Sequence, residues 1–448
     1  MLSSRLPKDL SPSPFFAELE RAKADVLAEC AEANSLPFID MTVSSPVKAG
    51  LPVDLDDAVD EGRKAFGNWS PDAAGWKSAR EAVVEYYRQR GGNFTAGQII
   101  LTASTSEAYS VLFKTFCDPG DVILTPMPGY PLLDTLAQLE HLECAPYFLK
   151  LKRERFDKLT DLKKVTERRS APAEVNAFRF VLDSDSLLAA PEHAKILLLV
   201  SPHNPTGHCV SREEWNEAVR FCEENNMILV VDEVFGDYAF SDKVSRTWNY
   251  VFDKNVIARN AVTKQSSSNV EPDLWDAGGG DFINLPENGP KCPIFWLNGL
   301  SKAVGSPQLK LGWMAFYAPR ENFEEIRAAL EFVEDAYLSV SAPAQALGAS
   351  LLKHSEAYES KVLDRLQQNW QTLREAFPSK YCPEVLGGWY AVVRLGEDDE
   401  ELTLRLLREK HVLVQPGFFF DFDEDGWVVT SLLQDPTIFK EAIQRFKQ

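Results

Sequence analysis

The fold can be predicted from residues 196–233, which read ILLLVSPHNPTGHCVSREEWNEAVRFCEENNMILVVDE. Two apolar runs, 196–200 and 227–231, have the length of strands and lack the alternation of a half-exposed strand, so both faces of each would be buried. Residues 211–225 between them are predicted to form a helix. A strand, a helix and a second strand in this order indicate neighbouring parallel strands covered by helices.

The same alternation continues on both sides of this stretch. Strands are predicted at 99–102, 121–124, 294–297 and 310–317, and helices at 14–33, 76–91 and 106–117. In the first helix, Phe16, Leu19, Ala22 and Val26 recur at helical spacing. We therefore expect an α/β fold with a mostly parallel central sheet and helices on both faces.

The chain divides into three parts on this reading. Residues 1–55 form an N-terminal arm and a helix, 56–322 a large domain, and 323–448 a smaller α+β domain on which the N-terminal helix packs. The small domain is predicted to hold a helical region over 323–352 that breaks near Ser341, helices near 355–376 and 400–410, and strands around 388–395 and 412–415. Within the large domain, 240–291 contains serine and glycine runs and is predicted to be a long loop or insertion.

The composition excludes several classes of function. The 448 residues contain 47 Lys and Arg against 67 Asp and Glu, a formal net charge of -20, so neither nucleic acid nor an anionic membrane is an expected partner. The seven cysteines are scattered and form no C-x-x-C, which favours the reduced thiols of a cytoplasmic protein. The sequence contains no pair of histidines at metal-binding spacing, so a metal site is not expected. It also contains no run of about eighteen apolar residues, so a membrane span is not expected.

Three polar side chains each follow a predicted strand. Asn204 lies in SPHNPTG after the first run, Asp232 ends the second, and Lys302 lies in LSK after 294–297. Because the carboxyl ends of parallel strands meet at one edge of a sheet, these side chains can converge on one crevice. An amine, a carboxylate and an amide suit a pyridine aldehyde cofactor: the amine condenses with the aldehyde, the carboxylate keeps the ring nitrogen protonated, and the amide donates to the ring oxygen.

A fourth segment offers a phosphate site. Residues 100–108 read ILTASTSEA, in which Ser104 and Glu107 have the spacing of a capping box. The free N–H groups of such a helix start, with the hydroxyls of Ser104, Thr105 and Ser106, can bind a phosphate dianion. The alternative is an ordinary capped helix.

The order of these motifs resembles the class I/II aminotransferases of fold type I, which bind pyridoxal 5'-phosphate (PLP). The resemblance spans roughly 36–448, is poor over 150–190 and 240–291, and is nearest to an alanine-aminotransferase-like bacterial subgroup. It also rests on Gly75 with the segment AREAV at 79–83, and on the basic residue Lys310 and Gly312-Trp313 that follow Lys302.

The resemblance implies a role for each matched position. Lys302 would hold PLP, Asp232 would face the ring nitrogen, and Tyr130, in PGYP, would stack on the ring. Ser301 and Lys310 would join Ser104, Thr105 and Ser106 at the phosphate. Trp69 would replace a tyrosine that reaches the phosphate of the partner subunit, which implies a homodimer with shared active sites.

Several positions depart from the family pattern. Phe235 stands where a tyrosine is usual, Lys310 replaces an arginine, and Gly299 replaces a serine. Ser45 replaces an asparagine or similar polar residue near the substrate. Val429 stands where most members carry the arginine that binds the substrate carboxylate. Arg394, predicted to share a strand face with Gly388, Tyr390 and Val392, is the expected substitute.

The function that the resemblance implies is a transaminase of the EC 2.6.1 type, which moves an amino group between an amino acid and a 2-oxo acid, with Lys302 as general base. The same scaffold supports PLP-dependent lyases that eliminate across a carbon–sulfur or related bond. A catalytically impaired PLP-binding relative is the third alternative.

Overall fold

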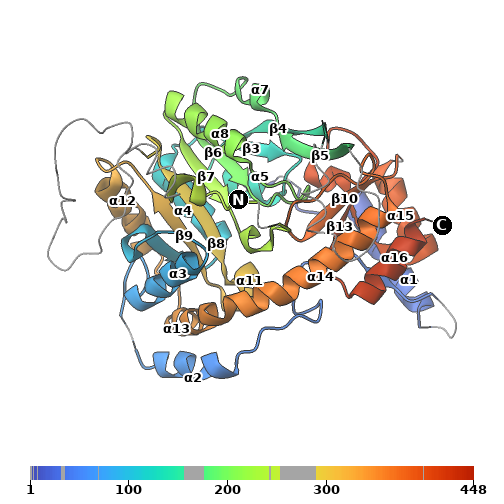
Figure 1. Ribbon diagram of the computed structural model, residues 1–448, viewed down its shortest axis with the longest axis horizontal. Coiled ribbons are helices and arrows are strands. Elements are labelled where there is room, and N and C mark those ends of the chain that lie inside the picture. The colour runs from blue at the N-terminus through green and yellow to red at the C-terminus, as the bar shows by residue number, and fades with distance from the viewer. Residues whose placement is uncertain are drawn as a thin grey trace.

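The computed structural model describes residues 3, 5–7, 9–31, 36–68, 70–155, 176–241, 244–252, 289–396 and 398–447. At its centre is an eight-stranded sheet (Figure 1), whose strands in spatial order are β2 (Ile99–Thr102), β9 (Gly312–Tyr317), β8 (Ile294–Gly299), β7 (Ile228–Asp232), β6 (Ala194–Val200), β3 (Val122–Met127), β4 (Glu143–Arg155) and β5 (Asn176–Leu182). Only β9 and β5 run against the other strands. The predicted mostly parallel sheet is confirmed.

Helices cover both faces of this sheet because its strands are apolar on both sides. On one face Leu197 and Leu199 pack in a cluster with residues of α3 (Lys77–Gln89) and α8 (Arg212–Glu224). On the other face Ile196 and Leu198 pack with residues of α4 (Thr105–Phe116), α5 (Leu132–Leu139) and α12 (Phe323–Asp335). Short helices α7 (Ser184–Leu187), α9 (Asn249–Phe252) and α11 (Leu300–Ala303) lie in the connections.

Two details differ from the prediction. Strand β9 begins at Gly312 rather than at Lys310, because Lys310 has a left-handed backbone (φ 53°) that no strand continues through. The poorly matched stretch 150–190 contains the end of β4, which pairs antiparallel with β5. Most of the predicted insertion at 240–291 (residues 242–243 and 253–288) lies outside the described residues.

The C-terminal part is built on a second, smaller sheet. Strands β10 (Tyr390–Arg394), β13 (Trp427–Ser431) and β12 (Gln415–Pro416) are antiparallel, and α13 (Ala342–Leu351), α14 (Ser355–Ala376), α15 (Asp399–Lys410) and α16 (Pro436–Phe446) are its helices. The 22 residues of α14, about 33 Å of helix, run from beneath the large sheet to the small one (Figure 1). We propose the same three-part division along the chain as the sequence suggested, although α12 packs on the large sheet and α13 packs against α2 and α3.

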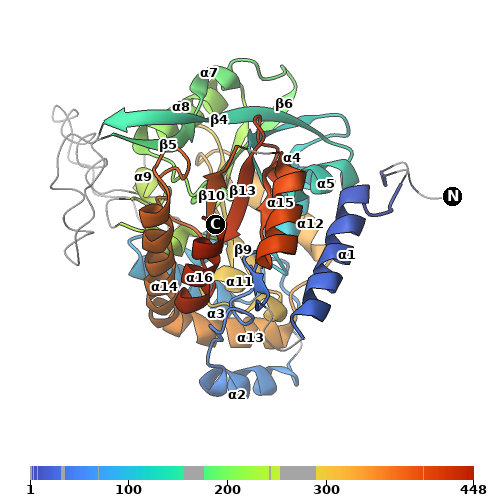
Figure 2. The same ribbon diagram turned by 90° about the vertical axis from the view of Figure 1, so that its right-hand side faces the viewer.

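The N-terminal segment packs on this C-terminal part. Helix α1 (Pro14–Glu29) lies beside α15 (Figure 2), and Phe15, Leu19, Ala22 and Val26 form its buried stripe. The prediction placed Phe16 in this stripe, but Phe16 is 43% exposed and Phe15 is the buried residue. Strand β1 (Ile39–Asp40) pairs with β11 (Val412–Leu413), and α2 (Asp56–Ala65) follows. Among the described helices, none has the length and apolar character needed to span a membrane.

Candidate active site

A cavity of about 390 Å³ lies at the carboxyl ends of the parallel strands. Asn204 reaches it from the turn after β6, Asp232 from the last position of β7, and Lys302 from α11, which follows β8 directly. The structure thus brings the three predicted side chains to one crevice. They converge because β6, β7 and β8 are neighbouring parallel strands that end at the same edge.

The amine of Lys302 lies among aromatic rings. Its Nζ is 4.6 Å from the ring centre of Trp389 and 5.3 Å from that of Phe235. Burial lowers the pKa of Lys302 to about 8, and the charge of Asp232 acts in the opposite direction. The Tyr238 hydroxyl donates to the Lys302 backbone carbonyl at 2.6 Å, which fixes the short helix that carries the amine.

Two donors orient the carboxylate of Asp232. The Tyr109 hydroxyl donates to Oδ2 at 2.7 Å, and the Val234 backbone N–H donates to Oδ1 at 3.0 Å. Burial raises the pKa of Asp232, and both hydrogen bonds and the charge of Lys302 oppose that rise. Sequence reasoning missed Tyr109. The available signal was its position four residues after Thr105, on the same face of α4.

The predicted phosphate-binding residues form one end of the cavity. Ser104, Thr105 and Ser106 line it at the start of α4, together with Ser301 and Lys310. Ser104 caps α4 by accepting from the Glu107 N–H at 3.2 Å, whereas the Glu107 carboxylate accepts from the Ala103 N–H and not from Ser104 itself. The remaining N–H groups of this first turn have no helical acceptor, as an anion site requires.

Two glycines allow this helix start to lie next to β8 and β9. A Cβ on Gly312 would meet the backbone of Ser104 at 3.0 Å, and one on Gly299 would meet the backbone of Gly312 at 3.0 Å. Gly299, at which the family usually has serine, therefore has a packing role here.

Tyr130 and Asn204 also line the cavity. Tyr130 is 49% exposed, so its ring is accessible from the cavity mouth. The turn before it is tied to the C-terminal part by a hydrogen bond of 2.8 Å from the Gly129 N–H to the Phe420 carbonyl. Among the described residues, the buried amide oxygen of Asn204 has no hydrogen-bond partner.

Two predicted positions are not brought to the cavity. Ser44 lines the wall where Ser45 was expected, and the Ser45 carbonyl instead accepts from Ala49. Arg394 pairs with Glu424 and lies over the ring of Trp427. Arg394 shares its face of β10 with Tyr390 and Val392 as predicted, whereas Gly388 precedes the strand. Arg394 lies four residues beyond Tyr390, about 13 Å along the strand. Trp69 lies outside the described residues.

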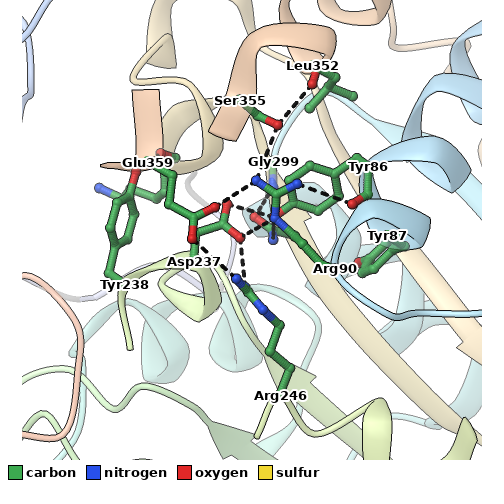
Figure 3. A network of polar contacts seen from close by, with 12 residues as sticks. Tyr86, Tyr87, Arg90, Asp237, Tyr238, Arg246, Gly299, Leu352, Ser355 and Glu359 are labelled. Atoms are coloured by element: carbon green, nitrogen blue, oxygen red, sulfur yellow. Dashed lines mark hydrogen bonds and ion pairs between the residues drawn. The ribbon is translucent and has the colours of Figure 1, made fainter. Parts of the chain in front are cut away.

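A buried ionic network is centred on Asp237, next to Tyr238 (Figure 3). Asp237 accepts from Arg90 at 2.9 Å, from Arg246 at 2.7 Å and from the Tyr86 hydroxyl at 2.7 Å. Arg90 also pairs with Glu359 of α14 at 2.8 Å. Burial disfavours the ionised form of Asp237, but the two guanidiniums outweigh it and lower the pKa of this carboxyl.

Residues 56–446 match the family model described as aminotransferase class I and II. A glutamate-pyruvate aminotransferase (AlaA) of Haemophilus influenzae is 24% identical over 78% of this chain and 75% of its own length. The tyrosine aminotransferase of Bos taurus is 25% identical over 92% of this chain and 81% of its own length.

Solved structures agree with these relatives in fold. The alanine aminotransferase of Pyrococcus furiosus has a TM-score of 0.69 at 21% identity, and covers 98% of both chains. A double mutant of the Thermus thermophilus aspartate aminotransferase has a TM-score of 0.71 at 19% identity, and covers 100% of this chain and 98% of its own. The expected fold type I and the resemblance to alanine-aminotransferase-like proteins are confirmed.

Proposed function

Because the chain belongs to the class I and II aminotransferase family, we propose that its cavity holds pyridoxal 5'-phosphate on Lys302 and that the cofactor serves amino-group transfer between an amino acid and a 2-oxo acid. The observation that carries this proposal is the convergence of Asn204, Asp232 and Lys302 on one cavity at the carboxyl edge of the sheet. The activity is of the EC 2.6.1 type.

The residues present fit this cofactor. The hydroxyl-rich start of α4 with Lys310 suits a phosphate, and the oriented carboxylate of Asp232 suits a protonated ring nitrogen. Among the described residues, the buried amide oxygen of Asn204 has no hydrogen-bond partner, which leaves this amide available to a ring substituent. Tyr130 offers an accessible ring for stacking.

The cofactor, when bound, supplies a protonated ring that withdraws electrons from the substrate nitrogen. Asp232 would keep the ring nitrogen protonated, and Tyr109 and Val234 would hold its carboxylate in place. Lys302 would take the proton from the substrate's amino-bearing carbon and hold it at Nζ for delivery to the cofactor side of the substrate nitrogen. Its lowered pKa, about 8, suits a base that works near neutral pH. The rings of Phe235 and Trp389 would exclude water from Nζ.

We also propose that the protein is a cytoplasmic homodimer. Phe332, Tyr337 and Leu338, at and just after the end of α12, are 79%, 54% and 44% exposed. Such a cluster of exposed large apolar side chains favours a protein partner. The cluster is close to the proposed phosphate site, because Ser339 donates to Glu107 of α4 at 2.8 Å. A second subunit on this cluster would therefore adjoin the active site. No specific observation favours the lyase alternative.

Removal of the Lys302 amine tests the proposal. Wild-type protein is expected to bind PLP, to gain a borohydride-stable adduct on Lys302, and to convert amino acids when a 2-oxo acid is present. Lys302→Ala is expected to lose the adduct and at least about 10³-fold in kcat, since the general base and the covalent attachment are both removed. Lys361→Ala, at an exposed position of α14, is the control. An adduct mapped to another lysine, or full turnover in Lys302→Ala, would refute the assignment.

A further inference from the structure

The register of the small sheet places Gln415 beside the position where the family carries its arginine. Val429 of β13 pairs with Gln415 of β12 on one side and with Val392 of β10 on the other. Residues directly opposite in an antiparallel pair point to the same face of the sheet. Gln415, Val429 and Val392 therefore form one row of side chains. The two valines are fully buried, and Gln415 lines the cavity.

Tyr390 and Ser44 complete this wall of the cavity. Tyr390 lies two residues before Val392 on the same strand face, and its ring is 8% exposed. Burial raises the pKa of its phenol, and a hydrogen bond with the Ser44 side chain opposes that rise. Among the described residues, the side-chain amide of Gln415 has no hydrogen-bond partner, whereas Tyr390 has Ser44. The amide is therefore the group on this wall that is available to a ligand.

The positively charged side chains of the cavity do not belong to the wall formed by Gln415, Tyr390 and Ser44. Lys302 and Lys310 are the cations among its lining residues, all of which belong to the described part of the chain. Lys302 is the proposed attachment point of the cofactor. Lys310 lies at the phosphate end, two residues before Gly312, whose backbone approaches Ser104. Arg394 is occupied by Glu424 outside the cavity. The wall formed by Gln415, Tyr390 and Ser44 is polar and uncharged.

Such a wall discriminates among substrates by the charge of the group that faces it. A carboxylate that enters the cavity loses water, and a guanidinium would compensate with two charge-assisted hydrogen bonds. A glutamine amide offers neutral donors and an acceptor instead. The glutamine amide can both donate to and accept from a substrate amide or hydroxyl, because those groups also donate and accept hydrogen bonds. It offsets only part of the cost of removing water from a carboxylate.

Resting on the proposed function, we infer that Gln415 is a specificity-determining residue that contacts the polar substituent on the amino-bearing carbon of the substrate. With Tyr390 and Ser44 beside it, Gln415 favours amino donors in which this substituent is uncharged, such as an α-amino amide or an amino alcohol. Donors with a free carboxylate are still converted, with a lower kcat/KM.

The test compares matched amino donors that share one side chain and differ only at this substituent: the α-amino acid, its primary amide and the amino alcohol. With wild-type holoenzyme, kcat/KM for the amide and the alcohol is expected to exceed that for the acid by about tenfold, mostly through KM. In Gln415→Arg, the ratio of these kcat/KM values is expected to shift by about 10–100-fold in favour of the acid, because the substitution supplies the missing cation. Dissociation constants from the absorbance change on donor binding give a second readout.

Two further variants control for charge and for folding. Gln415→Glu keeps the size of the side chain and is expected to weaken binding of the acid further, since two negative charges would face each other. Gln371→Arg adds the same charge on an exposed face of α14 and is expected to leave the ratio unchanged. Thermal unfolding of each variant shows whether the fold is retained.

The outcomes separate this inference from the proposed function. A holoenzyme with its adduct on Lys302 that prefers the acid by tenfold, with a ratio that Gln415→Arg and Gln415→Glu leave unchanged, would overturn the inference alone. Absence of any adduct on Lys302 would overturn the proposed function. A holoenzyme that binds and converts none of the three donors would count against both.

Discussion

At the scale of single residues, the environment of Lys302 sets the pH range in which it can react. The neutral amine is the form that condenses with an aldehyde, and the ordinary pKa of a lysine, about 10.4, leaves little of it at pH 8. Burial lowers the pKa of Lys302 to about 8, so half of the amine is neutral there.

We predict that the rate of PLP incorporation into cofactor-free protein rises with pH and levels off above about 8, the pKa of Lys302. Asp232→Asn should move the midpoint to lower pH, because Asp232 supplies the negative charge that raises this pKa. Stopped-flow absorbance across pH 6–10 measures both. A wild-type rate that still climbs steeply at pH 10 would contradict the prediction.

Some residues of the cavity can be predicted from where strands end, whereas others can be predicted only from how the helices and strands pack. Asn204, Asp232 and Lys302 each follow a strand directly, so strand ends alone predict their convergence. The sequence shows that Tyr109 shares a helix face with Thr105, but its contact with Asp232 depends on the rotation of α4 relative to β7. Gln415 needed the register of β12 against β13, which one sequence does not contain. Arg394 shows the same limit, since its strand face was predictable and its distance from the cavity was not.

At the scale of elements, the network around Asp237 joins segments that are distant in the chain. Arg90 ends α3, Asp237 lies in the turn after β7, and Ser355 and Glu359 begin α14 (Figure 3). Tyr238, next to Asp237, holds the Lys302 carbonyl. The ionic cluster therefore supports the helix that presents the catalytic amine.

Asp237→Asn is expected to destabilise the protein by about 3 kcal/mol, because it leaves two buried guanidiniums with Glu359 as their remaining carboxylate. Asp60→Asn is the control, since its pair with Arg63 is 3.2 Å long but both side chains are more than 70% exposed, and its loss should cost less than about 0.5 kcal/mol. Urea-induced unfolding measures the difference. Equal changes in the free energy of unfolding would show that the buried cluster contributes no more to stability than an exposed ion pair.

The elements that sequence missed have a physical explanation. The strands of the sheet centre are continuous apolar runs and were predicted within a few residues. The edge pair β4–β5 has Leu149 and Leu151 alternating with Lys150 and Lys152, a pattern of half-exposed strands that is weaker than a buried run. The β4–β5 edge is thus harder to predict than the sheet centre, because water replaces part of the apolar contact there. The other edge strand, β2, is buried along its length and was predicted at its observed bounds.

At the scale of the whole molecule, the exposed cluster at the end of α12 is the surface on which we expect a second subunit. The variant with Phe332→Asp and Leu338→Asp is predicted to be monomeric in sedimentation equilibrium, because charges in an apolar contact have no partner. It should also bind PLP more weakly, since the partner adjoins the phosphate site.

Leu188→Asp tests for a general effect of surface charge. Leu188 is 79% exposed and follows α7, which lies at the top of Figure 1, whereas α12 lies at the left. This variant should remain dimeric. A wild-type protein that is itself monomeric at micromolar concentration would refute the expected assembly.

The stretch from Met41 to Ser44 has a practical consequence for anyone who delimits the protein by similarity. The family match begins at residue 56. Yet Ser44 lines the cavity, the Met41 carbonyl accepts from the Ser431 N–H at 2.7 Å, and the Val43 carbonyl accepts from the Ser431 hydroxyl at 2.6 Å. A gene fragment that starts at the match would encode a nearly full-length polypeptide that lacks one wall of its cavity.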